Sequence, residues 1–489
     1  MSKMERRTIV RRAAAGTAAA LAFAALHASA QTAPPAAVKV SSTKERSEVS
    51  ITVYNQGFGL VREVRDLDLG KGRVALEFRD VAAQIQPETV AIKPLVGGAN
   101  ALNVLEQNYR YDLLSPQKLL EKYVGRKVKV YRWNEKLGKD EAFDAEVLAV
   151  NGGQSVLRIN GEITYDFPGR IAFPEVPANL IAKPTLVWLL DSNAQKQKVE
   201  ATYLTRGLSW KADYVFVLDE KDTAGDLTGW VTLTNTTGAS YENASLKLVA
   251  GDVQKVSGYD GEYAPKSKPM AAAPSGGGGF KEEGFFEYHL YTLQKPTDVL
   301  QNEQKQITLL EAAGVKIQKK LIFWGAAYYY RGSYGQVVSN QKVGVYLDVE
   351  NKQANKLGIP LPKGVVRVYK ADKSGAKQFV GEDRIDHTPR DEKIRVKMGE
   401  AFDIVGDRKQ MSWKTLGTCT SESEWEISLR NHKDSAETIE VFEPIGGDWE
   451  IVSSSLPANK RDAHTFTFDA KVPAKGETKI KYRVRVKWC

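Results

Sequence analysis

The residues with the clearest chemical potential lie in one short segment, Glu382–Glu392, which holds five acidic residues and one histidine among eleven residues. Carboxylate oxygens and an imidazole this close together are suitable ligands for a divalent metal ion. Asp386 or Asp391 could instead orient His387 as a general base. We therefore take Asp383, Asp386, His387 and Asp391 as candidate catalytic or metal-binding residues.

The same segment also fits a charged turn between two strands. Alternating sequence flanks it, Thr388-Pro389 lies at its tip, and Arg384, Arg390 and Lys393 can neutralise its acids. Charge-rich segments of this kind are usually solvated. For that reason the sequence leads us to expect no metal or other cofactor.

A second candidate site is a group of aromatic residues near position 330. Aromatic faces stack on sugar rings and on peptide side chains. Glycines at 325, 332 and 335 also allow a turn whose tyrosines merely pack on the core. The candidate ligand-binding residues are Trp324, Tyr328, Tyr329, Tyr330, Arg331 and Tyr334.

The sequence lacks the common motifs of enzymes. It contains no Gly-x-Ser-x-Gly, no His-Glu-x-x-His, no Cys-x-x-Cys, no phosphate-binding loop and no Gly-x-Gly-x-x-Gly. This shortage of catalytic groups favours a binding protein over an enzyme.

The elements that position these residues are predicted to be mainly β-strands. Apolar and polar residues alternate through most of the chain, and segments with helical periodicity are few. We expect a multi-domain β-sandwich protein with an inserted small SH3-like barrel and few short helices. The expected plan is a flexible lead (31–48), an N-terminal β-module (49–112), the small barrel (113–176), a long β-domain (177–407) and a C-terminal β-sandwich (408–489).

Two segments of this plan have distinctive sequences. In the small barrel a helix capped by Ser115 is predicted to precede strands at 127–133, 142–150, 154–160, 162–167 and 170–173. Residues 264–279 of the long domain are rich in Pro, Ala and Ser and end in four glycines. Such a composition cannot bury enough apolar surface to fold, so we expect a disordered loop.

The only two cysteines, Cys419 and Cys489, are candidates for a disulfide. If strands 422–429 and 479–488 pair antiparallel, Glu422 meets Lys487, Glu424 meets Arg485 and Glu426 meets Arg483, because opposite charges favour that register. The pairing brings the cysteines together. Three predicted strands between them argue instead for a parallel pair, so both alternatives stay open.

The N-terminal sequence predicts export. Arg6-Arg7, followed by Ile9, Val10 and Arg11, fits a twin-arginine signal, although an ordinary export signal is the alternative. An Ala-rich middle and Ala28-Ser29-Ala30 complete a signal peptide over residues 1–30. Cleavage near Ala30 would place the protein in the periplasm or outside the cell. We expect no transmembrane segment in the mature chain.

The charge of the mature chain argues against nucleic acid as a partner. The whole chain carries a formal net charge of +9, and the predicted signal peptide accounts for +4 of it. The remaining +5 is mild for a chain of this length, and the predicted compartment also separates it from nucleic acid.

Several motifs resemble a known bacterial family, the domain of unknown function 4139. They include Leu361–Tyr369, Gly381–Pro389 and Gly399–Asp403, with Leu248–Asp252 and Tyr288–Tyr291 upstream. The likeness covers about residues 180–488, and residues 49–95 resemble an N-terminal module that often precedes the family domain. The resemblance implies an exported multi-domain β protein and no agreed activity.

The sequence as a whole favours an exported, non-catalytic protein that binds or scaffolds envelope components. An envelope protein or a glycan is the expected class of partner. The alternative is a metal-dependent or general-base hydrolase centred on residues 383–391. The two differ in whether Asp383, Asp386, His387 and Asp391 converge in a pocket.

Overall fold

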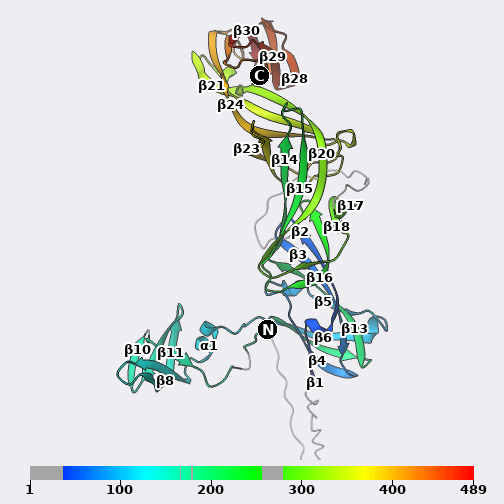
Figure 1. Ribbon diagram of the computed structural model, residues 1–489, viewed down its shortest axis with the longest axis vertical. Coiled ribbons are helices and arrows are strands. Elements are labelled where there is room, and N and C mark those ends of the chain that lie inside the picture. Colours follow the sequence, from blue (N-terminus) through cyan, green and yellow to red (C-terminus); the bar gives the residue numbers. More distant parts are fainter. Residues whose placement is uncertain (1–36, 166, 178–179, 256–278) are drawn as a thin grey trace, which may run out of the picture.

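The computed structural model describes residues 37–165, 167–177, 180–255 and 279–489. The predicted signal peptide and the Gly-rich loop, apart from residue 279, lie outside these residues. Most described residues belong to β-strands arranged in four sheets. Figure 1 shows an elongated molecule in which β1 and β4 lie toward one end, β28–β30 toward the other, and a smaller sheet to one side. No helix in the described residues is long and apolar enough to cross a membrane.

Two sheets form the end of the molecule that contains the N-terminal strands. The first has the order β1 (Ala37–Ser41), β4 (Gly72–Arg79), β12 (Thr185–Ser192) and β6 (Leu102–Arg110). The second has the order β17 (Phe280–Phe285), β18 (Tyr288–Leu293), β16 (Tyr241–Ala250), β2 (Arg46–Tyr54), β3 (Phe58–Asp68), β13 (Lys196–Arg206) and β5 (Ala91–Pro94), with β19 (Thr297–Val299) beside β16.

Part of the expected flexible lead is ordered. Within residues 31–48, Ala37–Ser41 form β1, which pairs in parallel with β4, and the short 3₁₀ helix η1 (Thr43–Glu45) follows. Ser42 caps η1 by accepting a hydrogen bond from the Lys44 N–H. Val38 and Val40 remain exposed. Backbone hydrogen bonds to β4 therefore hold β1 in place. The sequence pattern did not predict this strand, because its valines do not form a buried apolar face.

The smaller sheet contains the five strands predicted for the SH3-like unit. Its order is β10 (Glu162–Tyr165), β9 (Gln154–Ile159), β8 (Lys139–Asn151), β7 (Lys127–Asn134) and β11 (Arg170–Ala172). The preceding helix α1 (Pro116–Lys122) is capped as expected, because the Ser115 hydroxyl accepts from the Lys118 N–H. The hydrogen-bonded order is open rather than closed, so a closed SH3-like barrel stays a prediction.

The fourth sheet contains strands of three family motifs, Leu361–Tyr369, Gly381–Pro389 and Gly399–Asp403, and the candidate residues lie in its strands or in the connections between them. Its main order is β23 (Lys377–Ile385), β22 (Gly364–Ala371), β14 (Leu208–Leu218), β15 (Ala224–Asn235), β20 (Glu303–Trp324), β21 (Gln336–Glu350), β24 (Lys393–Thr415), β25 (Thr420–Asn431), β30 (Gly476–Lys487) and β27 (Asp448–Ser454). Off this path, β26 (Glu437–Pro444) pairs with β20 and β29 (Thr465–Val472), and β28 (Asn459–Asp462) pairs with β29. Short 3₁₀ helices are η2 (Pro87–Thr89), η3 (Ala99–Ala101), η4 (Ala327–Arg331) and η5 (Gln353–Asn355).

Buried hydrophobic side chains form three separate cores. The largest joins the N-terminal strands to the family domain, from Ile51 and Trp188 to Val396. A second core, around Trp425 and Phe466, lies among the C-terminal strands, and a third lies inside the small sheet. The long strands β20 and β24 contribute to both larger cores, so one continuous sheet connects them.

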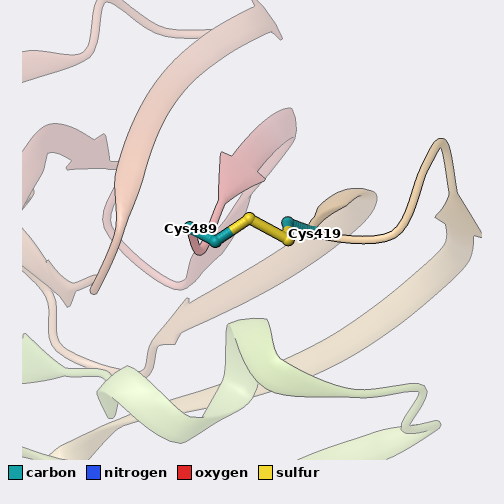
Figure 2. The surroundings of a disulfide bond; sticks show 2 residues. All are labelled: Cys419 and Cys489. Carbon is teal, nitrogen blue, oxygen red and sulfur yellow. A yellow bond between two sulfur atoms is a disulfide. The ribbon is translucent and has the colours of Figure 1, made fainter.

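The C-terminal strands settle the question of the cysteines. Strands β25 and β30 pair antiparallel, and a disulfide joins Cys419 to Cys489 with a Cα–Cα distance of 5.8 Å (Figure 2). The structure contains four strands between them, because the short β28 escaped the sequence-based count. Four intervening strands that alternate in direction restore an antiparallel pair.

The predicted register of that pair was wrong by two residues. Glu422 lies opposite Arg485, Glu424 opposite Arg483 and Glu426 opposite Lys481. Three ion pairs connect these rows of side chains, at 2.9 Å from Arg485 to Glu422, 2.9 Å from Arg483 to Glu424 and 3.2 Å from Lys481 to Glu426. A row of acids beside a row of bases satisfies either register, so the charge pattern did not fix the offset. The direction of the pair, which the sequence left open, is antiparallel.

Candidate functional site

His387 lies just after β23, at a place where two loops are fastened together. Thr388 and Leu361 exchange two backbone hydrogen bonds, from the Leu361 N–H to the Thr388 carbonyl at 2.8 Å and in return at 2.9 Å. This bridge fixes the backbone next to the histidine. The segment is a connection at the edge of the family domain, in line with the charged turn considered from the sequence.

Both ring nitrogens of His387 have partners. Nδ1 accepts a hydrogen bond from the Lys363 N–H at 3.3 Å, and Nε2 lies 3.0 Å from the side-chain amide of Asn55. The Asn55 atom at this distance is the amide nitrogen Nδ2. A neutral imidazole has one accepting and one donating nitrogen, so the tautomer decides which of the two neighbouring N–H groups, that of Lys363 or that of Asn55, donates to the ring. The ring therefore links the N-terminal β-module to the family domain.

The surroundings of His387 keep the ring neutral. Burial lowers its pKa, and the nearby charge of Lys363 lowers it further, while Asp252 and Asp386 act in the opposite direction. His289 also lowers this pKa. Both nitrogens of this half-buried ring thus face protein groups rather than open solvent.

The acidic candidates do not gather around His387. Asp383 accepts the N–H groups of Arg384 and Lys397, at 2.8 and 2.7 Å. Asp386 and Asp391 are exposed, and the Asp391 backbone has a left-handed φ of 67°. Across residues 37–489, wherever the structure describes them, no group of three or more His, Cys, Asp or Glu residues could hold a metal ion.

Sequence reasoning missed the true neighbours of His387. Asn55 comes from the turn between β2 and β3, Asp252 follows β16, and His289 lies on β18. Asp252 pairs with Lys363 at 3.3 Å, and His289 Nδ1 lies 2.8 Å from Glu282. Asp252 and His289 both occur in the family motifs named above, as His387 does. That common occurrence could have indicated that the three residues lie close together.

The aromatic candidates divide into a buried part and an exposed part. Tyr329 and Tyr330 are buried in the C-terminal core, which excludes them from ligand contact. The Tyr330 hydroxyl donates to Glu443 at 2.6 Å and lies 2.8 Å from the Tyr482 hydroxyl. Glu443 in turn pairs with Arg408 at 2.5 Å, and all four polar groups lie away from solvent.

What we call the aromatic surface comprises the exposed Tyr328, Arg331 and Tyr334 together with the partly buried Trp488. Tyr328 is 54% exposed and Tyr334 is 41% exposed, with ring centroids 6.2 Å apart in an edge-to-face arrangement. The Arg331 guanidinium lies 5.4 Å from the centre of the Trp488 ring. Trp488, which the sequence analysis did not propose as a ligand-binding residue, joins this surface because the disulfide holds the C-terminal residues in place.

Trp324, which is 37% exposed, packs against other neighbours. Its ring packs against Phe442 at 4.5 Å, and its indole N–H donates to the Tyr346 hydroxyl at 3.0 Å. We therefore keep Tyr328, Arg331 and Tyr334 as ligand-binding candidates and leave Trp324 out of that group.

Comparison with known proteins identifies the family domain. The model of a family described as "Domain of unknown function (DUF4139)" matches residues 199–489. A search of curated proteins found no match.

Proposed function

We propose that this chain, which belongs to the DUF4139 family, is an exported, non-catalytic protein that binds or scaffolds envelope components through the aromatic surface. The observation that carries the proposal is the division of the aromatic cluster. Its buried half anchors the segment. The other half leaves two contacting pairs open to solvent in whole or part: Tyr328 with Tyr334, and Arg331 with Trp488. Tyrosine, tryptophan and arginine are the residues most enriched at the centres of binding interfaces.

Export is supported by two independent features. The first is the signal-like sequence at residues 1–30, with its paired arginines and small residues at the expected cleavage position. The second is the disulfide between Cys419 and Cys489, since disulfides persist in oxidising compartments such as the periplasm.

Binding is supported by the rigidity of the aromatic surface. Gln410 holds the segment through three hydrogen bonds, accepting from the Tyr334 N–H and donating to the Gly332 and Gly335 carbonyls. At the other side the Trp488 N–H donates to the Cys419 carbonyl at 2.9 Å. A surface whose side chains are already ordered loses little entropy when a ligand binds.

The hydrolase alternative loses its support from geometry. Its proposed base, His387, is engaged at both nitrogens, and Asp386 and Asp391 are exposed to solvent. No observation among the described residues favours another catalytic centre, so we do not carry that alternative forward.

The proposal is tested by co-sedimentation of the purified mature protein with isolated peptidoglycan and, separately, with native envelope membranes. We expect saturable binding to one of them. A variant with both Tyr328→Ala and Tyr334→Ala should bind about 10-fold or more weakly, since loss of one central aromatic contact costs about 1–2 kcal/mol.

The matched control carries Tyr111→Ala and Tyr165→Ala, which remove tyrosines that are 71% and 76% exposed elsewhere. This control should bind like the wild type. Equal loss in both double variants, or none in the first, would contradict the role of the aromatic surface. Release of soluble fragments from the peptidoglycan by the wild type would contradict the non-catalytic assignment.

A further inference from the structure

A cavity of about 530 Å³ is lined by residues between Thr43 and Gln301, and none of them belongs to the aromatic surface. Such a volume falls within the range of sites for small molecules. Six chain segments form its walls: η1 and the start of β2, the residues after β4, Leu113, residues 182–184 before β12, the turn leading into β16 with the start of that strand, and a residue before β20. Its charged lining residues are Lys44, Arg46, Asp80, Lys183 and Glu242, and Ser240 and Gln301 add polar groups.

Arg46 lines the cavity, and its guanidinium group forms no ion pair with any described residue. Arg46 Nη1 is buried, yet it makes no hydrogen bond within the part of the chain that the structure describes. A buried donor of this kind costs free energy unless a partner is present. Lys44, on the same wall, is exposed and also forms no ion pair with any described residue.

The third cation of the cavity is already neutralised. Lys183 forms an ion pair with Asp80, and the other Asp80 oxygen accepts the Thr43 N–H at 3.2 Å. Asp80 thereby fastens the wall made by η1 to the wall made by residues 182–184. Two cationic side chains of the lining, Arg46 and Lys44, therefore have no ion-pair partner among the described residues. One exposed acid, Glu242, also lines the cavity.

The opposite wall is rigid and polar. Gln301 accepts the Gly238 N–H at 2.7 Å through its side chain, and its backbone N–H donates to the Ser240 hydroxyl oxygen at 3.1 Å. Gly238 has a φ of 91°, and a Cβ there would lie 2.7 Å from the Ala83 Cβ. The Ser240 hydroxyl still has its own proton to donate to a ligand.

We propose that this cavity binds a small organic molecule through a carboxylate or phosphate group held by Arg46 and Lys44. Guanidinium groups pair with planar carboxylates and with phosphates through charge-assisted hydrogen bonds. Ser240 and Glu242 then face the polar remainder of the ligand, which favours a hydroxylated or amino-bearing acid over a hydrocarbon chain. The site is distinct from the aromatic surface, and its ligand is a small molecule rather than a polymer.

The test uses the full mature protein and two probes, inorganic phosphate and citrate, against chloride at matched ionic strength. Isothermal titration calorimetry and the unfolding temperature are measured for wild type, Arg46→Gln, Lys44→Gln and Arg73→Gln. Arg73 is the matched control, because it is an exposed arginine of the same region without an ion pair among the described residues.

We expect saturable binding of at least one probe by the wild type and by Arg73→Gln. Arg46→Gln should weaken it about 10-fold or more, as expected for the loss of a charge-assisted hydrogen bond, and Lys44→Gln by a smaller factor. Phosphate alone or citrate alone as the bound probe would identify which acid the site prefers.

Binding by neither probe would overturn the proposal, as would equal affinity in Arg46→Gln and the Arg73→Gln control. Should Arg46→Gln fail to fold, Lys44→Gln decides, because its exposed side chain can be replaced without disturbing the core. Unchanged affinity in that variant would then reject the site.

Discussion

Replacing Glu443 by glutamine removes the negative charge at the centre of the C-terminal core. Glu443 is fully buried and accepts hydrogen bonds from Arg408 at 2.5 Å and from the Tyr330 hydroxyl at 2.6 Å. Because Tyr330 belongs to η4, this carboxylate also anchors the segment that presents the aromatic surface.

The expected loss follows from the charge that is left behind. Burial is the largest single influence and opposes the charged form of Arg408, but Glu443 together with Tyr482 and Tyr330 holds the pKa of Arg408 above its usual range. An arginine does not escape by losing its proton, so Glu443→Gln leaves an uncompensated buried cation. Breaking a buried ion pair in this way costs about 3–5 kcal/mol.

The matched variant removes both charges. Arg408→Met combined with Glu443→Leu fills the site with apolar side chains, and such replacements are often neutral or stabilising. We therefore expect the double variant to be more stable than Glu443→Gln alone. Urea unfolding followed by tryptophan fluorescence measures both, because Trp425 is buried within ring contact of Tyr330. A loss below about 1 kcal/mol for Glu443→Gln would refute the reasoning.

Three further perturbations test other parts of the structure. His387→Gln should flatten the pH dependence of stability. The pKa of His387 is lowered in the folded state, so the wild type loses stability as the pH falls from about 6.5 through that lower pKa. An unchanged slope of the free energy of unfolding against pH, measured by urea unfolding, would contradict this linkage. Cys419→Ser should lower the free energy of unfolding by up to about 4 kcal/mol, because the disulfide closes a loop of 70 residues, and reductant should reproduce the effect in the wild type but not in the variant. Gly251→Ala should lower the unfolding temperature measured by circular dichroism, because its φ is 138° and a Cβ would lie 2.4 Å from Tyr288, whereas Gly335→Ala, with open space around it, should not.

Local sequence pattern predicted the strands well. Alternation placed a strand at 479–488, and the structure has β30 at Gly476–Lys487 with Ile480, Tyr482, Val484 and Val486 buried. The five strands of the small sheet were also predicted within a few residues of their bounds. These features depend only on which face of a strand is apolar, and one sequence is enough to show that.

Contacts between distant segments were harder to predict. Nothing in the sequence near Asn55 indicates that its amide meets His387, which lies 332 residues further along the chain. Similarly, Tyr328, Tyr329 and Tyr330 look alike in sequence, but only the last two point into the core. The turn of η4 decides which ring is buried, and glycines on both sides made a turn predictable without fixing its orientation.

The most direct test of the account is the hydrogen-exchange footprint of the mature protein bound to envelope material. The account predicts slower exchange at residues 327–335 and near Trp488 in the bound state, with little change at residues 382–392. Protection centred on the His387 segment, or binding with no protection at the aromatic surface, would contradict it.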